Sequence, residues 1–203
     1  VLIGLTIFVA LGKDPVQGLL VFFWEPIKST YAIGELLVKA TPLLLIALGL
    51  AVCFRSNVWN IGAEGQYVVG AIAAGGIALT ANADSTGWIV VSILLAGTAG
   101  GMVWAGLVAW LRDRFNANEI LVSLMLVYVA IQLLQYMVYG PWKDPNGYNF
   151  PQTKTFDAVT KIPRLMQGSR VSIGLLLALV GAGAVWVYLY RTRAGFAQQV
   201  GGL

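Results

Sequence analysis

The chain contains no histidine and a single cysteine, and charged side chains make up only 11% of its 203 residues. Without histidine, metal sites and acid–base pairs built on imidazole are disfavoured. The HExxH, CxxC and GxxxxGK[ST] motifs are missing from the sequence as well. We therefore expect no metal, no cofactor and no catalytic activity in this chain, and we expect any energy source to lie in another protein. The lone Cys53 lies in an apolar run and is interpreted as a small buried hydrophobe.

The scarcity of charge is matched by an excess of apolar residues. Hydrophobic residues account for 58% of the chain, against roughly 45–50% in soluble domains. The 13 basic and 9 acidic residues are scattered and give a net charge of +4 without a dense basic run, so nucleic acid is not an expected partner. The composition predicts an all-α protein, a polytopic transmembrane helix bundle that occupies residues 1–203 as one domain.

Six apolar segments are candidate membrane spans: 1–11, 40–54, 66–81, 88–111, 120–140 and 171–190. The first has no basic leader and no small-residue cleavage site, so it is interpreted as a truncated span rather than a signal peptide, and the sequence as a fragment. Segment 19–26 is too short to cross and is expected at the membrane interface. The polar, proline-rich segment 141–170 is expected to be an external loop.

Arginines in short turns predict which side faces the cytoplasm. If the segments alternate, the arginines at 55, 112, 114, 191 and 193 all fall on one side, and short basic turns face the cytoplasm. Against this assignment, the 141–170 loop also carries several basic residues and is short enough to count. The short arginine turns favour the first orientation.

The stretch 54–66, FRSNVWNIGAEGQ, places polar groups between two short apolar segments, a pattern seen where helices break inside membrane proteins. Glycines there allow tight backbone and close packing, amides can satisfy freed backbone groups, and Glu64 can pair with Arg55 or accept backbone N–H bonds. A structural hinge is favoured over a surface that lines a solute path or contacts a partner. The residues of this structural motif are Asn57, Asn60, Gly62, Glu64, Gly65 and Gln66.

A second polar group lies on segment 120–140. It consists of Tyr128, Gln132, Gln135 and Tyr139, whose spacing of i, i+4, i+7 and i+11 places them on one helix face. Such a face is costly against lipid, so it is expected to meet protein or a water-filled cavity. Phenols and amides together suit a neutral solute with a stackable ring and hydroxyls. Hydrogen bonding between helices is the alternative.

The run FRSNVWNIGAEGQYVVGA resembles the signature of bacterial ABC importer permeases of the branched-chain amino acid, ribose and nucleoside superfamily. FNANEILVSLMLVYVA (115–130) and YGPWKDPNGYNFPQT (139–153) are similar to its nucleoside/simple-sugar branch, although Val127 stands where that branch leads us to expect asparagine. The resemblance implies a permease of about ten spans, of which about six are present here. It also implies that the 120–140 span lines the central path, which favours the solute interpretation of its polar face.

Partners and a coupling element follow from the same resemblance. The implied partners are ATP-binding subunits, a second permease subunit and an external solute-binding lipoprotein, assembled in the bacterial cytoplasmic membrane. RTRAGFAQQVGG (191–202) resembles the start of a cytoplasmic coupling loop, 191–203, that docks on the ATPase. Its coupling candidates are Arg191, Arg193, Gly195 and Gly201.

These observations predict a permease subunit that imports a small polar solute, with ATP hydrolysed by a partner. A nucleoside is the preferred solute and a simple sugar, ribose-like or galactose-like, the first alternative. An ion-coupled secondary transporter is less favoured because Glu64 is the only candidate for its coupling carboxylate, and a membrane-embedded enzyme is least favoured because no nucleophile and base are paired. The hinge interpretation predicts that Glu64→Gln damages assembly more than solute selectivity.

Overall fold

The computed structural model describes residues 2–82, 85, 87–148, 150–165 and 168–202. The chain divides into two compact units, which comprise Val1–Ala47 with Pro163–Ala184 and Leu48–Ile162 with Val185–Leu203. Two long helices, α3 (Thr30–Arg55) and α7 (Gly174–Arg191), contribute residues to both units. Each unit is therefore described by itself.

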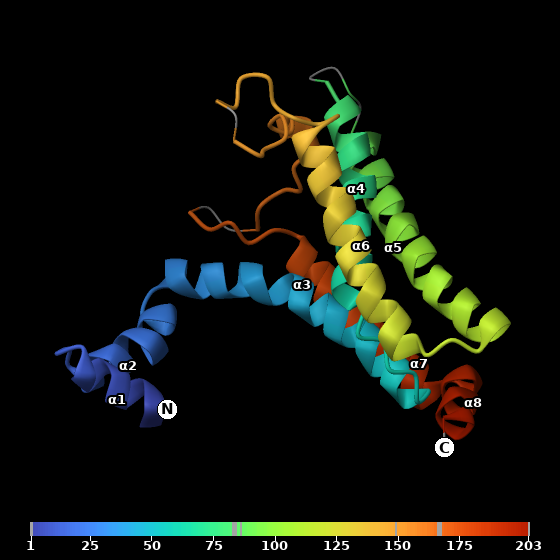
Figure 1. The fold of residues 1–203 in the computed structure, drawn as a ribbon, viewed down its shortest axis with the longest axis horizontal. Helices are drawn as coiled ribbons and strands as arrows, with labels where there is room; N and C mark the ends of the chain where they lie inside the picture. The colour runs from blue at the N-terminus through green and yellow to red at the C-terminus, as the bar shows by residue number, and fades with distance from the viewer. Residues whose placement is uncertain (1, 83–84, 86, 149, 166–167, 203) are drawn as a thin grey trace. The chain divides into compact units, whose positions relative to one another are not determined.

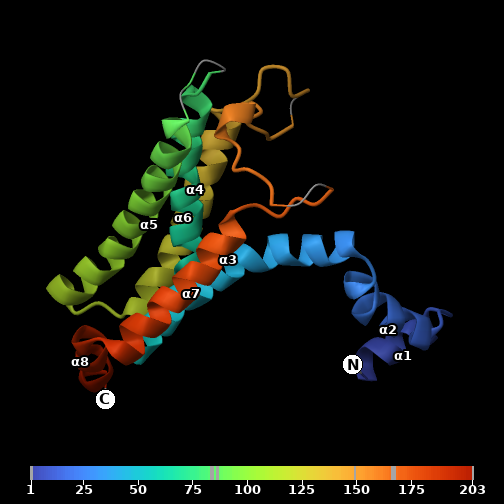
Figure 2. The same ribbon diagram turned by 180° about the vertical axis from the view of Figure 1, so that it is seen from behind.

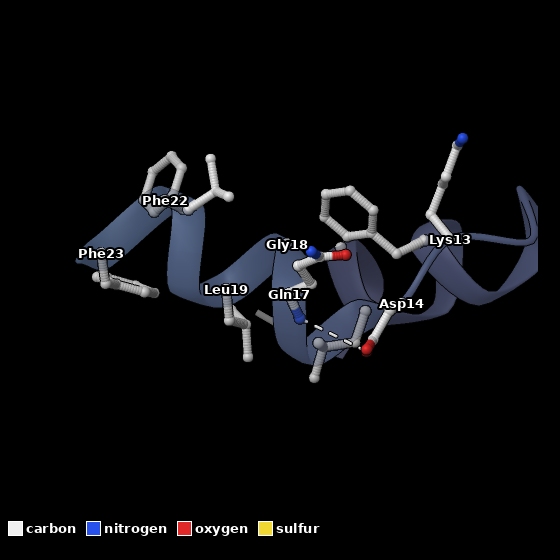
Figure 3. A pocket seen from close by; sticks show the side chains of 11 residues that line it. Lys13, Asp14, Gln17, Gly18, Leu19, Phe22 and Phe23 are labelled. Atoms are coloured by element: carbon white, nitrogen blue, oxygen red, sulfur yellow. Dashed lines mark hydrogen bonds between the residues drawn. The ribbon is translucent and has the colours of Figure 1, made fainter. Parts of the chain in front are cut away.

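The first unit begins with a hairpin of two short helices, α1 (Leu2–Ala10) and α2 (Pro15–Phe23), followed by the 3₁₀ turn η1 (Glu25–Ile27). Asp14 caps α2, because its side chain accepts a hydrogen bond from the backbone N–H of Val16 at 2.9 Å. A largely apolar pocket of about 740 Å³ lies between the two helices, with phenylalanines on its walls and the charged turn residues at one side (Figure 3).

The start of α3 is tied to the segment that precedes α7 within the first unit. The Arg170 guanidinium donates to both carboxylate oxygens of Glu35, through Nε at 2.8 Å and through Nη2. This hydrogen bonding raises the pKa of Arg170 above its ordinary value. Beside the ion pair, Gly34 lies directly against Ser169, and an added Cβ there would lie 3.3 Å from the Ser169 Cβ. The ion pair and the close packing together hold residues 169–170 against α3.

The second unit contains three helices that pack side by side, α4 (Ala63–Thr80), α5 (Trp88–Phe115) and α6 (Glu119–Tyr139) (Figures 1 and 2). Helix α4 contacts both of the others, and glycines make the contact with α5 close. An added Cβ at Gly70 would lie 2.8 Å from the carbonyl oxygen of Gly97. Gly97 and Gly101 of α5 thus allow the two helices to approach closely. The short helices η2 (Ala158–Thr160) and α8 (Arg193–Gly201) complete this unit.

Four described helices, α3, α5, α6 and α7, are long and apolar enough to cross a membrane. The all-α membrane bundle is therefore confirmed, while the number of spans remains approximate. Helix α1 has nine residues, which cover only about 14 Å at 1.5 Å per residue. Helix α4 is the other expected span outside these four. It opens with Glu64 and Gln66 and has five buried residues, so protein rather than lipid covers much of its surface.

The polar segment 141–170 folds partly back onto the second unit. Trp142 lies over Gly75 and Gly76 of α4, where added Cβ atoms would lie 3.6 and 3.5 Å from the indole ring. An antiparallel bridge between Lys143 and Thr153 closes the first loop of this segment. Its last part, from Pro163, belongs to the first unit. Its external position and the single-domain organisation of the chain stay predictions.

Candidate functional site

The connection between α3 and α4 contains the polar motif at 54–66. The backbone of Asn57 is left-handed, with a φ of 54°, a conformation that asparagine tolerates better than most residues. Its side-chain oxygen accepts a hydrogen bond from the Trp59 indole at 3.3 Å, and the Trp59 ring packs against Phe54 with centroids 5.4 Å apart. These contacts end α3 and turn the chain toward α4.

Two amides close this connection. The amide nitrogen of Asn60 donates to Gln66 Oε1 at 3.3 Å, and the amide nitrogen of Gln66 donates back to Asn60 Oδ1 at 3.2 Å. The backbone N–H of Gly62 donates to the same Asn60 oxygen at 3.0 Å. Asn60 therefore satisfies a backbone donor at the start of α4 and fixes the first turn of that helix through Gln66.

The two glycines of the motif bring α4 against α6. At Gly62 an added Cβ would lie 2.8 Å from the Ser123 Cβ, and at Gly65 it would lie 3.0 Å from the Val127 Cα. Both glycines are buried, and so are their partners. Val127 is only 6% exposed, so the position that departs from the nucleoside/sugar branch packs between helices and faces no open space.

Glu64 and Arg55 do not pair with each other. The Arg55 guanidinium donates to the Tyr190 hydroxyl at 2.7 Å and lies over the same ring, 5.5 Å from its centroid. Glu64 is exposed in the first turn of α4 and forms no hydrogen bond or ion pair with any described residue. Neither partner expected from the sequence is present, so the carboxylate is available to a group outside this chain or to water.

The polar face of α6 is exposed along its whole length. Tyr128 and Tyr139 are 65% and 61% exposed, and Gln132 and Gln135 are exposed between them. The buried residues of the helix, Ser123, Val127 and Ala130, lie on the opposite side. Within the described chain, no other segment covers the polar face.

One further residue of this face was not predicted from the sequence. Tyr136 is 66% exposed and follows Gln132 by four residues, so it flanks the stripe on the same side of the helix. Toward the start of α6 the same face becomes apolar, with Leu121 and Met125 exposed. The polar groups of this face thus begin at Tyr128 and continue to Tyr139 at the end of α6, as their positions in the sequence already indicate.

The coupling candidates lie on and beside α8, which begins directly after α7. Thr192 caps α8 by accepting the Gly195 N–H at 3.0 Å. Gly195 is buried against the last turn of α7, where an added Cβ would overlap the carbonyl oxygen of Tyr188. In contrast, nothing lies within 4 Å of an added Cβ at Gly201. Of the two glycines that are coupling candidates, only Gly195 is required by the packing of the described residues.

Gln198 holds α8 in place, although no sequence motif predicted it. Its amide nitrogen donates to the Val52 carbonyl at 3.2 Å and to the Ser56 hydroxyl, while its oxygen accepts the Tyr188 hydroxyl at 2.8 Å. Gln199 donates to the Leu189 carbonyl at 2.7 Å. One side of α8 is therefore held by the end of α3 and the last turn of α7, and the partners at the end of α3 lie 146 and 142 residues from Gln198, too distant to be recognised from a sequence motif.

The other side of α8 is open. Phe196 and Val200, one turn apart, are 68% and 53% exposed. Arg193 is exposed at the start of the helix, and the Arg191 guanidinium lies over the Trp186 ring at 5.6 Å. The segment whose sequence resembles a coupling loop thus exposes two apolar side chains and two arginines.

A family model described as the permease component of branched-chain amino acid transport systems matches residues 32–202. The chain belongs to this permease family. The superfamily assignment made from the motifs is thereby confirmed, and several of the described helices are apolar enough to cross a membrane.

Curated relatives of the permease match the nucleoside/sugar branch. The glucose ABC transporter permease protein of Haloferax volcanii is 36% identical over 96% of this chain and 53% of its own length. The guanosine permease of Bacillus subtilis is 30% identical over 82% of this chain and 48% of its own length. The nucleoside permease of Lactococcus lactis is 25% identical over 100% of this chain and 57% of its own length. The chain thus spans about half the length of these relatives. No solved structure matches it.

Proposed function

We propose that the chain forms part of the permease subunit of an ATP-driven importer, which moves a small polar solute across the bacterial cytoplasmic membrane. The observation that carries the proposal is the attachment of α8 by Gln198 to the last turns of α3 and α7. A displacement of α8 would be transmitted directly to the end of α3, where the 54–66 connection begins. An ATPase that docks on the open side of α8 could in this way drive the helices.

The proposed partners follow from this arrangement and from the family. ATP-binding subunits would contact Phe196, Val200 and the adjacent arginines. The exposed polar face of α6 would line the solute path, because phenols and amides are costly against lipid, and a second permease subunit would complete the transporter. An external solute-binding lipoprotein would deliver the solute. The alternative of an ion-coupled secondary transporter lacks this support, since Glu64 is exposed and no described carboxylate is paired with it in a buried ion site.

The proposed solute is a nucleoside, with a simple sugar as the second candidate. Tyr128 and Tyr139 offer aromatic rings to a base or a sugar ring, and Gln132 and Gln135 offer donors and acceptors to hydroxyls. The guanosine and nucleoside permeases support the first candidate. The glucose permease, at 36% identity, supports the second.

Uptake by the complete transporter tests this proposal. In proteoliposomes with ATP inside and the solute-binding protein outside, we expect uptake of labelled guanosine to depend on ATP. Unlabelled nucleosides should compete at lower concentration than hexoses; the reverse order would assign the sugar. Uptake that continues without ATP but collapses with an ionophore would contradict the ATP-driven mechanism.

Substituting the amides of the α6 face tests the solute path. We expect Gln132→Leu with Gln135→Leu to lower uptake about fivefold or more, because two hydrogen bonds to the solute are lost at roughly 0.5–1.5 kcal/mol each. Transporter assembly, followed by size-exclusion chromatography, should be unchanged. Met125→Leu, on the apolar half of the same exposed face, is the matched control. Normal uptake in the double variant, or loss of the assembly, would instead assign these amides to helix association.

A further inference from the structure

A cavity of about 540 Å³ lies within the second unit, among the ends of α3 and α5, the 54–66 connection and the start of α6. One wall is a stripe on α5 with the spacing i, i+3, i+4, i+7 and i+8, which places its members on one helix face. The stripe changes character along the helix. Ala105, Val108 and Ala109 are apolar, whereas Arg112 and Asp113 are charged.

The length of α5 places this change of character near the membrane surface. The helix has 28 residues and so measures about 42 Å at 1.5 Å per residue, whereas the hydrocarbon core of a bilayer is roughly 30 Å thick. The charged end of α5 therefore extends into the headgroup layer. Trp110, 56% exposed beside the cavity stripe, is of a residue type enriched at that depth.

The charged groups of the cavity retain unused hydrogen-bonding capacity. Arg112 pairs with Glu119 through Nη1 at 3.4 Å, and its side chain is 43% exposed. A guanidinium has five N–H donors, so most of them remain available. Asp113 is exposed and forms no hydrogen bond or ion pair with any described residue. With two carboxylates and one guanidinium, the lining carries an excess of negative charge.

We propose that this cavity binds the headgroup of a zwitterionic aminophospholipid, with the ammonium group between Asp113 and Glu119 and the phosphate on Arg112. The excess negative charge disfavours anionic lipids and free phosphate, whereas an ammonium group brings three N–H donors to the two carboxylates. The apolar part of the stripe accommodates the glycerol and the start of an acyl chain. A neutral sugar or nucleoside would leave the Asp113 carboxylate without an ionic partner.

Occupancy would affect the 54–66 connection, because Asn60 and Gln66 also line the cavity. Their paired amides join the end of the connection to the first turn of α4. A bound headgroup would fill the space beside this pair and hold α5 and α6 against it. The lipid would thus stabilise the part of the permease that lies next to the attachment of α8. This inference does not depend on which solute is transported.

Lipid retention by the complete permease tests the proposal. The transporter is reconstituted in nanodiscs of equal parts phosphatidylethanolamine, phosphatidylcholine and phosphatidylglycerol, extracted in mild detergent, and examined by native mass spectrometry. We expect one phosphatidylethanolamine to remain per permease, because choline lacks N–H donors and phosphatidylglycerol lacks the ammonium. Asp113→Asn should lower its retention about three- to tenfold, since a charge-assisted hydrogen bond is lost.

Arg114→Gln is the matched control, because Arg114 is exposed on the same turn of α5 and does not line the cavity. It should retain the lipid as the wild type does. Ala109→Phe fills the cavity from its apolar wall and should displace the lipid without removing a charge. Equal retention of the three lipids, or unchanged retention in both Asp113→Asn and Ala109→Phe, would overturn the proposal. Displacement of the lipid by guanosine or glucose would overturn it as well and assign the cavity to the solute.

Discussion

Replacing Gly195 with alanine is expected to abolish most ATP-dependent uptake. The added Cβ would overlap the carbonyl oxygen of Tyr188 and lie 2.8 Å from the Cα of Leu189. Both contacts are with backbone, so no side-chain rotation relieves them and α8 must move away from α7. Such overpacking costs about 1–3 kcal/mol, which corresponds to a shift of about 5- to 150-fold in the population of the docked helix. Uptake and ATP hydrolysis should be measured together in proteoliposomes.

Gly201→Ala is the matched control on the same helix. Nothing lies within 4 Å of its added Cβ, so uptake should stay within about twofold of the wild type, as for most surface substitutions. Gln198→Leu tests the hydrogen bonds that attach α8 independently of a steric clash, because it removes the bonds to α3 and α7 and leaves the backbone packing of α8 unchanged. We expect it to preserve ATP hydrolysis and to lower the solute moved per ATP. Wild-type coupling in both Gly195→Ala and Gln198→Leu would contradict the role given to α8.

The long helices could be located from the sequence to within a few residues because uninterrupted apolar runs mark them, although α5 continues through the charged residues 112–114. Segment 88–111 corresponds to α5, Trp88–Phe115, and segment 120–140 to α6, Glu119–Tyr139. The role of segment 66–81 was harder to predict. In a hydropathy pattern its glycines look like ordinary lipid-facing positions. In the structure they bring the backbone of α4 against α5 and α6, so protein covers the helix surface at these positions.

Side-chain partners were the least predictable part of the candidate site. Asn60 and Gln66 are six residues apart and were both recognised, but a single sequence does not show that their amides bind each other. The partners of Gln198 on α3 lie 142 and 146 residues away. Arg55 is the plausible cationic partner of Glu64 in the sequence, but in the structure its guanidinium donates a hydrogen bond to the Tyr190 hydroxyl instead. Such pairings depend on how helices meet, which local periodicity does not encode.

Replacing Gly65 with valine is expected to separate α4 from α6 and to unfold the second unit at a lower temperature. An added Cβ at this position would lie 3.0 Å from the Val127 Cα and 3.2 Å from the Trp104 indole nitrogen. The contact with Val127 involves backbone, so the two helices must move apart to admit two further methyl groups. The expected cost is about 1–3 kcal/mol or more, measured as the loss of thermal stability of the purified permease in detergent.

Gly106→Val provides the matched comparison, because it introduces the same side chain into a long helix where nothing lies within 4 Å of the added Cβ. Its Tm should stay close to that of the wild type, whereas Gly65→Val should lower the Tm and, with it, the yield of assembled transporter. Because Glu64 is exposed and has no partner among the described residues, we now expect Glu64→Gln to leave the Tm unchanged, in place of the assembly defect that the sequence alone suggested. If Gly65→Val kept the Tm of Gly106→Val but lost uptake or changed solute selectivity, the 54–66 motif would line the solute path and would not be a structural hinge.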